Sequence, residues 1–366
     1  MSRGDSMRKY TKKSSMLMIV SLMIMLFSGC TGDKYSNANQ RGKKDFKVGM
    51  VLYNAEDTFI SYIRDMVDYY IELYEDEAGV NIELEVLDSA NNQALQNTQI
   101  DHFIKNGYDV ILANTVDREE ASMIIDKVQK AKIDTIFFNR EPVPQDMKKW
   151  NRIYYVGSSA EEAGRMQGEI LVDAINNGLE LDKNKDGKIQ YVMIEGEYGH
   201  QDAILRTYHC IKVLEENGLN MENLATDTGR WFKKEAKEKM ENWLEEFGDK
   251  IEIVLANNDE MALGAIEAMK AYDYFNGDQW IPVIGVDGVD EALEAIEAGT
   301  MIGTILNDYD EQAKCIVYKL YQCIGVNDLN INISTQEKDN YFWVKHKKVT
   351  KENVNTVKKH NSILKK

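Results

Sequence analysis

The chain has 366 residues, enough for two domains of ordinary size, and 43% of them are hydrophobic, as is normal for a globular protein. The formal net charge of −17 makes nucleic acid and anionic lipid unfavourable partners. Soluble macromolecules and neutral small ligands suit this charge better.

The amino-terminal 29 residues predict an export signal. Basic residues from Arg8 to Lys13 precede an apolar run at 16–27, which is too short to span a bilayer as a stable helix. The run ends in LFSGC at 26–30, which resembles a lipoprotein processing site, although Phe27 stands where an aliphatic residue is usual. Either Met1 or Met7 could be the start.

This pattern predicts an extracytoplasmic protein that is lipidated at Cys30 and anchored to the outer face of the cell membrane. In a cell with an outer membrane, that location is the periplasm. Residues 30–45 are polar and small, and we expect them to form a tether between the lipid and the folded part.

From residue 46 onward, short apolar runs alternate with longer amphipathic segments. The apolar runs predict strands at 47–52, 82–87, 110–113, 135–138, 153–156, 190–194, 251–256, 283–286 and 301–306. Helical periodicity is clear at 59–77, 160–176, 233–246 and 259–272. This alternation predicts an α/β fold of parallel sheets covered by helices on both faces. Because about 300 residues is too many for one such sheet of ordinary width, we expect two lobes.

Polar side chains follow most of the predicted strands. They are Asp57, Asn114, Asn139, His200, Asp202, Asn258, Asp287 and Asn307. Any one of them is typical of a helix cap, but ligands of parallel sheets bind beyond the carboxyl ends of the strands. Carboxylates and amides satisfy sugar hydroxyls, and the rings of Phe59 and Trp231 suit the apolar faces of a sugar. The set therefore predicts a sugar site, although either ring alone would more often belong to the core.

The segment DKNKDGKIQ at 182–190 matches the opening of a calcium loop. Asp182, Asn184 and Asp186 alternate before Gly187, so their oxygens can converge on a hard cation. The twelfth position, which normally carries a bidentate Glu, is Met193. The residues alone leave two alternatives, a solvated charged turn or a metal site completed by a carboxylate from elsewhere in the fold.

Cys210, Cys315 and Cys323 follow no CxxC spacing. The last two would lie about 12 Å apart along one helix, too far for a disulfide. We expect all three to be small buried residues.

The order and spacing of these segments resemble the galactose/glucose-binding protein family, calcium-containing members of the type I periplasmic-binding fold. The resemblance covers residues 46 to about 354. Its segments are DTF at 57–59, NTVD at 114–117, FFNREP at 137–142, YVG at 155–157, the calcium loop, EGEYGHQD at 195–202, RT at 206–207, DTGRW at 227–231, IVLANND at 253–259, GVD at 285–287 and LND at 306–308. Departures include Gln201 in place of a common Pro, the residues after Trp231, and a loosely similar tail after Asn327.

The resemblance implies two sets of functional residues. Sugar contacts fall on Asp57, Phe59, Asn114, His200, Asp202, Arg206, Trp231, Asn258, Asp287 and Asn307. A structural Ca²⁺ would be held by Asp182, Asn184, Asp186, the carbonyl of Lys188, Gln190 and the distant Glu252. In the family this glutamate supplies the missing bidentate ligand.

The resemblance also implies a domain division. The N-terminal lobe would comprise 46–138 plus 309–340, and the C-terminal lobe 139–308 plus 341–366. Three hinge crossings would lie near 138–141, 308–310 and 335–345. Closure of the lobes around the sugar would create the surface that a membrane transporter recognises.

The function implied is that of a monomeric solute-binding lipoprotein that captures a hexose, galactose and/or glucose, and delivers it to the membrane permease of an ABC importer. Whether a chemoreceptor also recognises the protein is left open. The alternative is a receptor of the same fold for another pentose, hexose or signalling sugar.

Two other classes of function are disfavoured. The sequence contains no HExxH, GxSxG, P-loop or strand-linked GxGxxG motif, so we do not expect an enzyme. A sugar-responsive transcription regulator of this fold would need an N-terminal helix-turn-helix, where this chain has an export signal.

Overall fold

The structure, a computed structural model, describes residues 43–277 and 279–364, with side chains up to residue 359. The expected signal peptide, Cys30 and residues 30–42 of the tether lie outside the described residues. The last tether residues are structured, because the first strand already begins at Lys44.

The first sheet has six strands in the order β11-β5-β4-β3-β1-β2, and all its neighbouring pairs are parallel. Its strands are β1 (Lys44–Leu52), β2 (Val80–Asp88), β3 (Val110–Ala113), β4 (Asp134–Phe138), β5 (Ile153–Ser158) and β11 (Tyr341–Val344).

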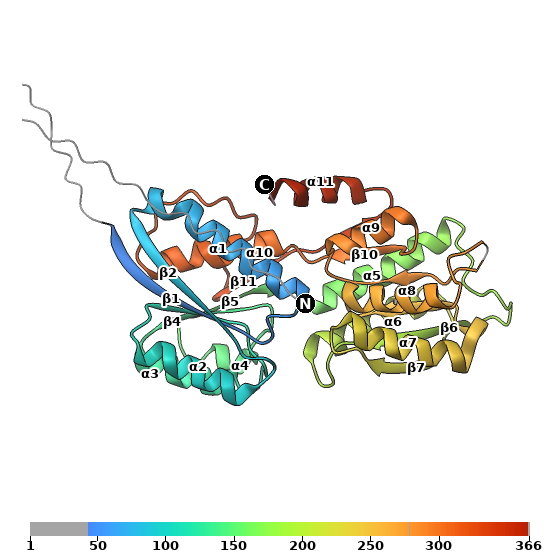
Figure 1. Cartoon of the computed structure of the whole chain (residues 1–366), viewed down its shortest axis with the longest axis horizontal. Coiled ribbons are helices and arrows are strands. Elements are labelled where there is room, and N and C mark those ends of the chain that lie inside the picture. Colours follow the sequence, from blue (N-terminus) through green and yellow to red (C-terminus); the bar gives the residue numbers. More distant parts are fainter. Residues whose placement is uncertain (1–42, 278, 365–366) are drawn as a thin grey trace, which may run out of the picture. The chain divides into compact units, whose positions relative to one another are not determined.

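Helices cover both faces of the first sheet (Figure 1). They are α1 (Thr58–Ala78) and α10 (Tyr309–Cys323) on one face, and α2 (Gln93–Lys105), α3 (Ala121–Ala131) and the short α4 (Pro144–Met147) on the other. Alternation along β1 explains the two cores. Val48, Met50 and Leu52 pack beneath α1 and α10, whereas Val51 points to the opposite face.

The second sheet also has six strands, in the order β12-β10-β9-β8-β6-β7. Its strands are β6 (Ile189–Glu195), β7 (Met221–Thr228), β8 (Ile253–Ala256), β9 (Val283–Ile284), β10 (Gly303–Leu306) and β12 (Lys347–Thr350). Strand β12 is antiparallel to β10, while the other neighbours are parallel.

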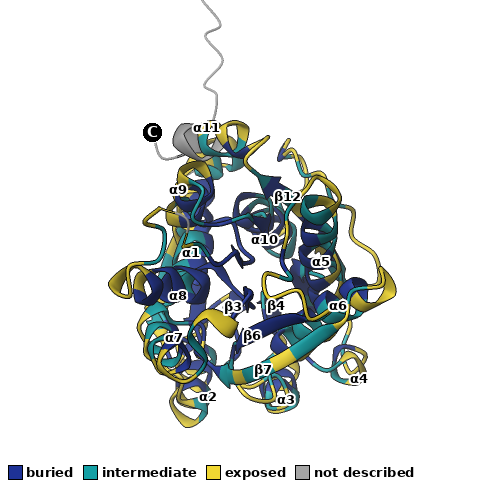
Figure 2. Cartoon of the chain, turned by 90° about the vertical axis from the view of Figure 1, so that its right-hand side faces the viewer, coloured by how far each residue is buried: buried dark blue, intermediate teal, exposed yellow. Residues whose placement is uncertain are grey.

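The helices of the second lobe follow the same arrangement. They are α5 (Ala160–Asn176) and α6 (Gln201–Glu216) on one face, and α7 (Lys233–Phe247), α8 (Asp259–Ala271), α9 (Asp290–Ala298) and α11 (Val354–Leu364) with the 3₁₀ turn η1 (Gly248–Lys250) on the other side. Figure 2 shows mostly buried strands surrounded by helices whose outer surfaces are exposed, while the edge strand β7 is itself partly exposed. The parallel sheets are therefore covered on both faces, which confirms the predicted α/β fold with two lobes.

Three crossings join the lobes. They lie between β5 and α5, between β10 and α10, and between β11 and β12. The second crossing, between Leu306 and Tyr309, lies close to the expected position near 308–310. The third, between Val344 and Lys347, lies at the carboxyl-terminal end of the expected interval 335–345.

The expected lobe boundaries differ from the observed sheets. Strand β5 belongs to the first sheet because it pairs with β4, so the first crossing comes after Ser158 and not near 138–141. Strand β11 also pairs with β5 and joins the first sheet, whereas the sequence placed residues from 341 onward in the C-terminal lobe. Strand pairing decides both assignments.

The described cysteines are free, as expected. Cys210 and Cys315 are buried, while Cys323 is only half-buried. In the part of the chain that the structure describes, no helix combines the length and the apolar character needed to cross a bilayer.

Candidate functional site

Loops at the carboxyl ends of strands from both sheets meet in a cavity of about 30 Å³, here called the inter-lobe cavity. The first lobe contributes Tyr53, Asp57, Phe59, Ile60, Asn139 and Arg140, and the second lobe contributes His200, Asp202, Arg206, Trp231, Asn258 and Asp287. The structure therefore brings together all the expected ligand residues except Asn114 and Asn307.

Asn114 and Asn307 lie just outside the lining. The Asn114 amide donates to the Phe138 carbonyl (3.2 Å) and its oxygen accepts the Tyr53 N–H (3.3 Å). Asn307 accepts from Gln312 (2.7 Å), and its backbone N–H donates to the Asp287 carbonyl (3.0 Å). Both side chains brace loops that carry lining residues.

Three lining residues were not expected from the sequence, namely Tyr53, Ile60 and Arg140, and a fourth, Asn139, was in the set that predicts a sugar site but not among the contacts implied by the resemblance. Tyr53 and Ile60 continue apolar stretches and resemble core positions. Asn139 was noted only as a polar residue after a strand, and Arg140 follows it inside a segment already used for the resemblance. The proximity of Asn139 and Arg140 to a strand end was the available signal.

Three lining residues also cap helices. Asp57 accepts the Ile60 N–H at the start of α1 (3.0 Å), and Asn258 accepts the Met261 N–H at the start of α8 (3.0 Å). His200 caps α6 through Nδ1, which accepts the Asp202 N–H (3.1 Å). The amino-terminal ends of three helices are thereby directed toward the cavity, where hydrogen-bond donors are needed.

Burial and positive neighbours keep His200 uncharged. Burial, together with Arg140 and Arg206, lowers the pKa of His200 well below its usual value. Because Nδ1 accepts the capping hydrogen bond, the neutral ring carries its proton on Nε2. His200 can thus offer one N–H donor to a ligand hydroxyl.

Asp57 is held by Tyr53. The Tyr53 hydroxyl donates a short hydrogen bond to the Asp57 carboxylate. Burial raises the pKa of Asp57, and burial with the nearby carboxylate raises the pKa of Tyr53. A buried carboxylate with free acceptor capacity is suited to accept hydrogen bonds from hydroxyl groups that replace water.

Arg206 organises the acceptors of the second lobe. It donates to the Asn257 carbonyl (2.8 Å) and to Asp202 (3.2 Å), one turn earlier on α6, and it lies 3.9 Å from Asp287. Its buried Nε has no partner among the described residues. An unsatisfied buried donor beside two carboxylates favours a ligand that brings hydroxyl oxygens.

Asp287 stands on a constrained loop. Its φ of 127° is rare for a residue with a side chain, and its backbone N–H donates to the Ile305 carbonyl (2.8 Å). Burial raises the pKa of Asp287, and Arg206 offsets part of this effect.

Asp259 holds the loop that carries Asp287 through three hydrogen bonds. Its carboxylate accepts the Gly288 N–H (2.7 Å), the Val289 N–H (3.1 Å) and the Thr304 hydroxyl (2.6 Å). The unusual backbone at Asp287 is thus held by its surroundings, as expected for a binding position.

Two aromatic rings line the cavity from opposite lobes, Phe59 from α1 and Trp231 from the loop after β7. The Trp231 ring meets His200 edge to face with ring centres 5.1 Å apart, and its buried Nε1 has no partner among the described residues. Gly196 permits this position, because a Cβ there would lie 2.1 Å from the Trp231 ring. Aromatic rings from the two lobes, with polar groups among the lining, suit a ligand that has apolar faces and a polar edge.

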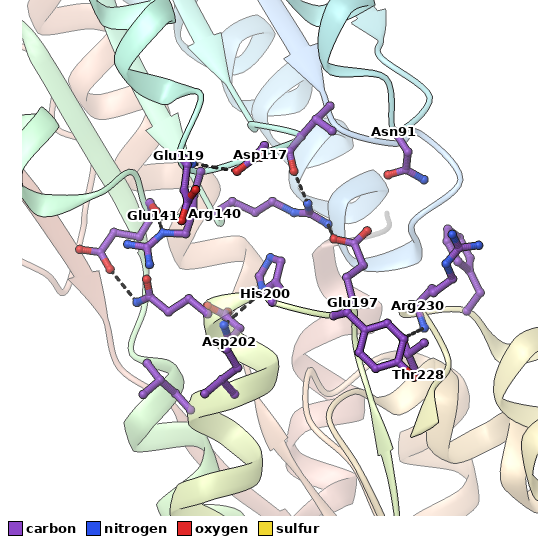
Figure 3. A pocket seen from close by; sticks show the side chains of 18 of the residues that line it. Asn91, Asp117, Glu119, Arg140, Glu141, Glu197, His200, Asp202, Thr228 and Arg230 are labelled. Atoms are coloured by element: carbon purple, nitrogen blue, oxygen red, sulfur yellow. Dashed lines mark hydrogen bonds and ion pairs between the residues drawn. The ribbon is translucent and has the colours of Figure 1, made fainter. Parts of the chain in front are cut away.

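A larger cleft of about 1080 Å³, here called the outer cleft, adjoins the inter-lobe cavity (Figure 3). The two spaces share Arg140, His200 and Asp202. Most other residues of the outer cleft are charged or exposed, including Tyr198, which is 76% exposed. The convergent polar groups and the paired rings belong to the smaller cavity, which is therefore the candidate binding site.

The calcium loop at 182–190 contacts Glu252, which lies 62 positions after Gln190 in the sequence. Glu252 accepts the Lys183 N–H (2.6 Å) through one oxygen and the Gln190 N–H (3.0 Å) through the other. Asp182 accepts the Gly187 N–H (3.0 Å), and Asp186 accepts from the Gln190 amide (2.8 Å). Glu252 lies just before β8, and not within it as the sequence suggested.

The loop's carboxylates are engaged by backbone amides. In the described part of the chain, no three His, Cys, Asp or Glu side chains are grouped closely enough to hold a metal ion. The donor set is nevertheless made of oxygens from carboxylates and side-chain amides, which is the chemistry that a hard cation selects.

Comparison with known proteins identifies the family. The model of the periplasmic binding protein domain matches residues 48–325. The chain belongs to this family. It is 37% identical to the D-galactose/methyl-galactoside binding periplasmic protein MglB of Haemophilus influenzae, over 84% of this chain and 87% of that protein.

Two other relatives are less similar in sequence. The xylitol-binding protein of Mycolicibacterium smegmatis is 28% identical over 76% of this chain and 70% of its own length. A solute-binding protein of an ABC transporter from Bacillus halodurans, solved with bound myo-inositol, superposes with a TM-score of 0.70 at 28% identity, covering 88% of this chain and 99% of that one. These relatives are ligand-binding proteins, and this periplasmic binding protein is likewise not an enzyme.

Proposed function

We propose that this protein binds a hexose, galactose or glucose, in the inter-lobe cavity and delivers it to the permease of an ABC importer. The observation that carries the proposal is the lining itself. Three carboxylates, two amides, two arginines and a neutral histidine line a space that Phe59 and Trp231 also line. A hexose ring presents hydroxyls around its edge and C–H groups on its faces, which this arrangement complements.

The name of the H. influenzae relative supports galactose as the first candidate. Its 37% identity extends over most of both chains, so the comparison includes both lobes. Relatives named for xylitol and solved with myo-inositol support a second candidate, a different sugar or polyol bound in the same cavity. Function resides in the site and not in the fold, so only binding measurements separate the two.

Ligand entry requires the lobes to separate. Small-molecule sites usually occupy roughly 300–1,000 Å³, so a cavity of about 30 Å³ is too small for a hexose in this conformation. The side chains from the two lobes fill the space that a sugar would occupy. Opening and closing about the three crossings would admit the ligand and then enclose it.

Calorimetric titration tests this proposal. Purified protein would be titrated with galactose, glucose, ribose, xylose, xylitol and myo-inositol. We expect saturable one-site binding of galactose or glucose, with weaker binding of the pentoses, which lack one hydroxymethyl group. The absence of measurable binding of both galactose and glucose would contradict the proposal, and tight binding of a polyol alone would support the second candidate.

We further propose that the loop at 182–190 binds a structural Ca²⁺ together with Glu252. Asp182, Asn184, Asp186, the Lys188 carbonyl, Gln190 and Glu252 would hold the ion. The hydrogen bonds between this loop and Glu252 support the proposal, because they place the distant carboxylate at the loop. When bound, the cation would staple the loop to the start of β8, a stabilising role away from the inter-lobe cavity.

Export and lipidation at Cys30 remain part of the proposal, with the protein anchored outside the cell membrane as a monomer. The signal-like segment and the periplasmic family support an extracytoplasmic location. A chemoreceptor is a further partner that the proposal allows but does not require.

A further inference from the structure

An ion pair joins the two lobes at the boundary between the inter-lobe cavity and the outer cleft. Arg140 follows β4 of the first lobe, and Glu197 follows β6 of the second. The Arg140 Nη2 lies 3.1 Å from the Glu197 Oε2, as drawn in Figure 3. Arg140 is 4% exposed and the Glu197 side chain is 28% exposed, so solvent screens this pair less than a surface pair.

Arg140 is fixed on the first lobe by two other contacts. Its Nη1 donates to the Val116 carbonyl (2.8 Å), and its guanidinium carbon lies 3.5 Å from the centre of the Tyr53 ring. Tyr53 in turn donates to Asp57, a candidate sugar contact. The guanidinium is therefore held in place before it meets Glu197, so pairing costs little side-chain entropy on the arginine side.

Glu197 belongs to the same turn as His200. The His200 N–H donates to the Glu197 carbonyl (3.1 Å), and His200 then caps α6 and lines the inter-lobe cavity. A contact that pulls Glu197 toward the first lobe therefore also sets the position of His200. One ion pair thus connects the Tyr53–Asp57 side of the cavity to the His200 side.

Other hydrogen bonds among the described residues also cross between the lobes. Thr58 donates to Glu260 (3.1 Å), and Gln201 donates to Glu141 (3.0 Å). Each has one neutral partner, whereas Arg140 and Glu197 carry opposite charges. Of these contacts, only the Arg140–Glu197 pair therefore adds attraction between two full opposite charges.

We propose that the Arg140–Glu197 pair couples ligand binding to closure, with Glu197 acting as a positioning residue that holds the closed lobes and places His200 over the ligand. This inference rests on the proposed binding function of the inter-lobe cavity. A bound ligand would displace the side chains that fill the cavity here, and the lobes would close around it with the pair formed at the cavity's edge. The pair therefore adds affinity without Glu197 lining the inter-lobe cavity.

The test compares Glu197→Gln with Glu235→Gln. Both carboxylates line the outer cleft, but Glu235 faces Arg230 of its own lobe (3.7 Å). Calorimetry with galactose, or with whichever sugar of the panel binds, should show that Glu197→Gln weakens affinity roughly tenfold. Glu235→Gln should stay within about twofold of the wild type, since exposed pairs contribute little.

A double-mutant cycle separates coupling from general damage. With Arg140→Met as background, Glu197→Gln should have no further effect on affinity. Raising NaCl from about 50 mM to about 500 mM should reduce the difference in sugar affinity between the wild type and Glu197→Gln, because salt screens the ion pair. Equal affinities for Glu197→Gln and Glu235→Gln, or additive effects in the cycle, would overturn the proposal.

Energy transfer between dyes on the two lobes provides a readout that does not depend on sugar identity. Cysteines introduced at the exposed Tyr69 of α1 and Tyr208 of α6 would carry the dyes, in a Cys323→Ser background. Without sugar, the wild type should populate closed molecules more than Glu197→Gln does. If no sugar in the panel binds, the proposed function fails. The energy-transfer comparison then tests by itself whether the Arg140–Glu197 pair favours the closed form. Equal populations of closed molecules in the wild type and in Glu197→Gln would contradict the proposal.

Discussion

At the residue scale, several side chains serve the backbone and the cavity at once. Asp57, His200 and Asn258 cap helices while lining the inter-lobe cavity. Their capping bonds fix their rotamers, so the binding groups are oriented before a ligand arrives. Preorganisation of this kind reduces the entropy lost on binding.

Gly196 offers a test of the aromatic wall. A Cβ at this position would lie 2.1 Å from the Trp231 ring, so Gly196→Ala must displace the indole. We expect a loss of roughly 1–3 kcal/mol in the free energy of unfolding and weaker sugar binding. Denaturant unfolding and calorimetry would measure the two effects.

Gly229→Ala is the matched control. Its Cβ would meet the Met261 sulfur at 2.8 Å, and a flexible methionine side chain can move aside. This variant should lose less affinity than Gly196→Ala. A Gly196→Ala protein with wild-type stability and affinity would show that the indole does not depend on Gly196.

Asp259 predicts a pH dependence of stability. Burial raises the pKa of Asp259 to about 6 from an ordinary value of 3.8, although its hydrogen bonds oppose the shift. The folded state therefore binds more protons than the unfolded state between these values. Stability from this group is highest below about pH 3.8 and is lost as the pH rises through 6.

Comparison with Asp259→Asn isolates the effect. The variant does not titrate at this position, so the wild-type free energy of unfolding minus that of the variant should fall from pH 4 to pH 6 and then level off. Urea unfolding at each pH would measure it. A difference that stays constant or rises over this range would contradict the assignment.

At the element scale, the buried strands and long helices could be predicted from the sequence, but of the edge strands only β2 was predicted, while β7, β11 and β12 were not. Strand β3 and helix α5 have the expected bounds because each carries a clear periodic pattern. Strand β7 was missed because it lies at a sheet edge, pairs only with β6, and is mostly polar and half-exposed. Strand β11 was treated as part of a loosely similar tail, and only its pairing with β5 assigns it to the first sheet.

Much of the candidate site could be predicted because its polar residues follow strands and two aromatic residues suit a sugar ring, and the resemblance supplied Arg206. Tyr53 could not be separated from the core by pattern alone, since it directly follows the apolar β1 and is almost fully buried. The ion pair between Arg140 and Glu197 depends on how the two lobes face each other. No local pattern carries that information.

The calcium loop is the element whose stability is expected to depend on a ligand. Adding Ca²⁺ at about 100 times its Kd should stabilise the wild type by about 2.7 kcal/mol, and chelation should lower the melting temperature. Glu252→Gln should respond much less to Ca²⁺, because it loses a proposed carboxylate ligand. Calorimetric melting with and without Ca²⁺ would measure the response.

Glu222→Gln is the appropriate control for the loop. Glu222 contacts Lys188 (3.0 Å) and the Gln190 amide (3.0 Å), yet it is not a proposed ligand. This variant should keep the full Ca²⁺ response. A wild type whose melting temperature is indifferent to both Ca²⁺ and chelation would refute the site.

At the scale of the folded chain from residue 43 onward, two sheets joined by three crossings enclose a cavity that is nearly closed. The polar loops of both lobes face this cavity, and the contacts between lobes include the Arg140–Glu197 pair. A hexose could enter only when these contacts open. Binding and closure are therefore two parts of one equilibrium.

The central claim is that a hexose binds between the lobes, and calorimetric titration of galactose into the wild type and Asp287→Asn tests it most directly. Asparagine can also adopt unusual backbone angles, so the variant should fold, but it loses the charged acceptor beside Arg206 (3.9 Å). We predict one binding site in the wild type and at least about tenfold weaker affinity in the variant. No binding to the wild type, or equal affinity in a folded variant, would contradict the account.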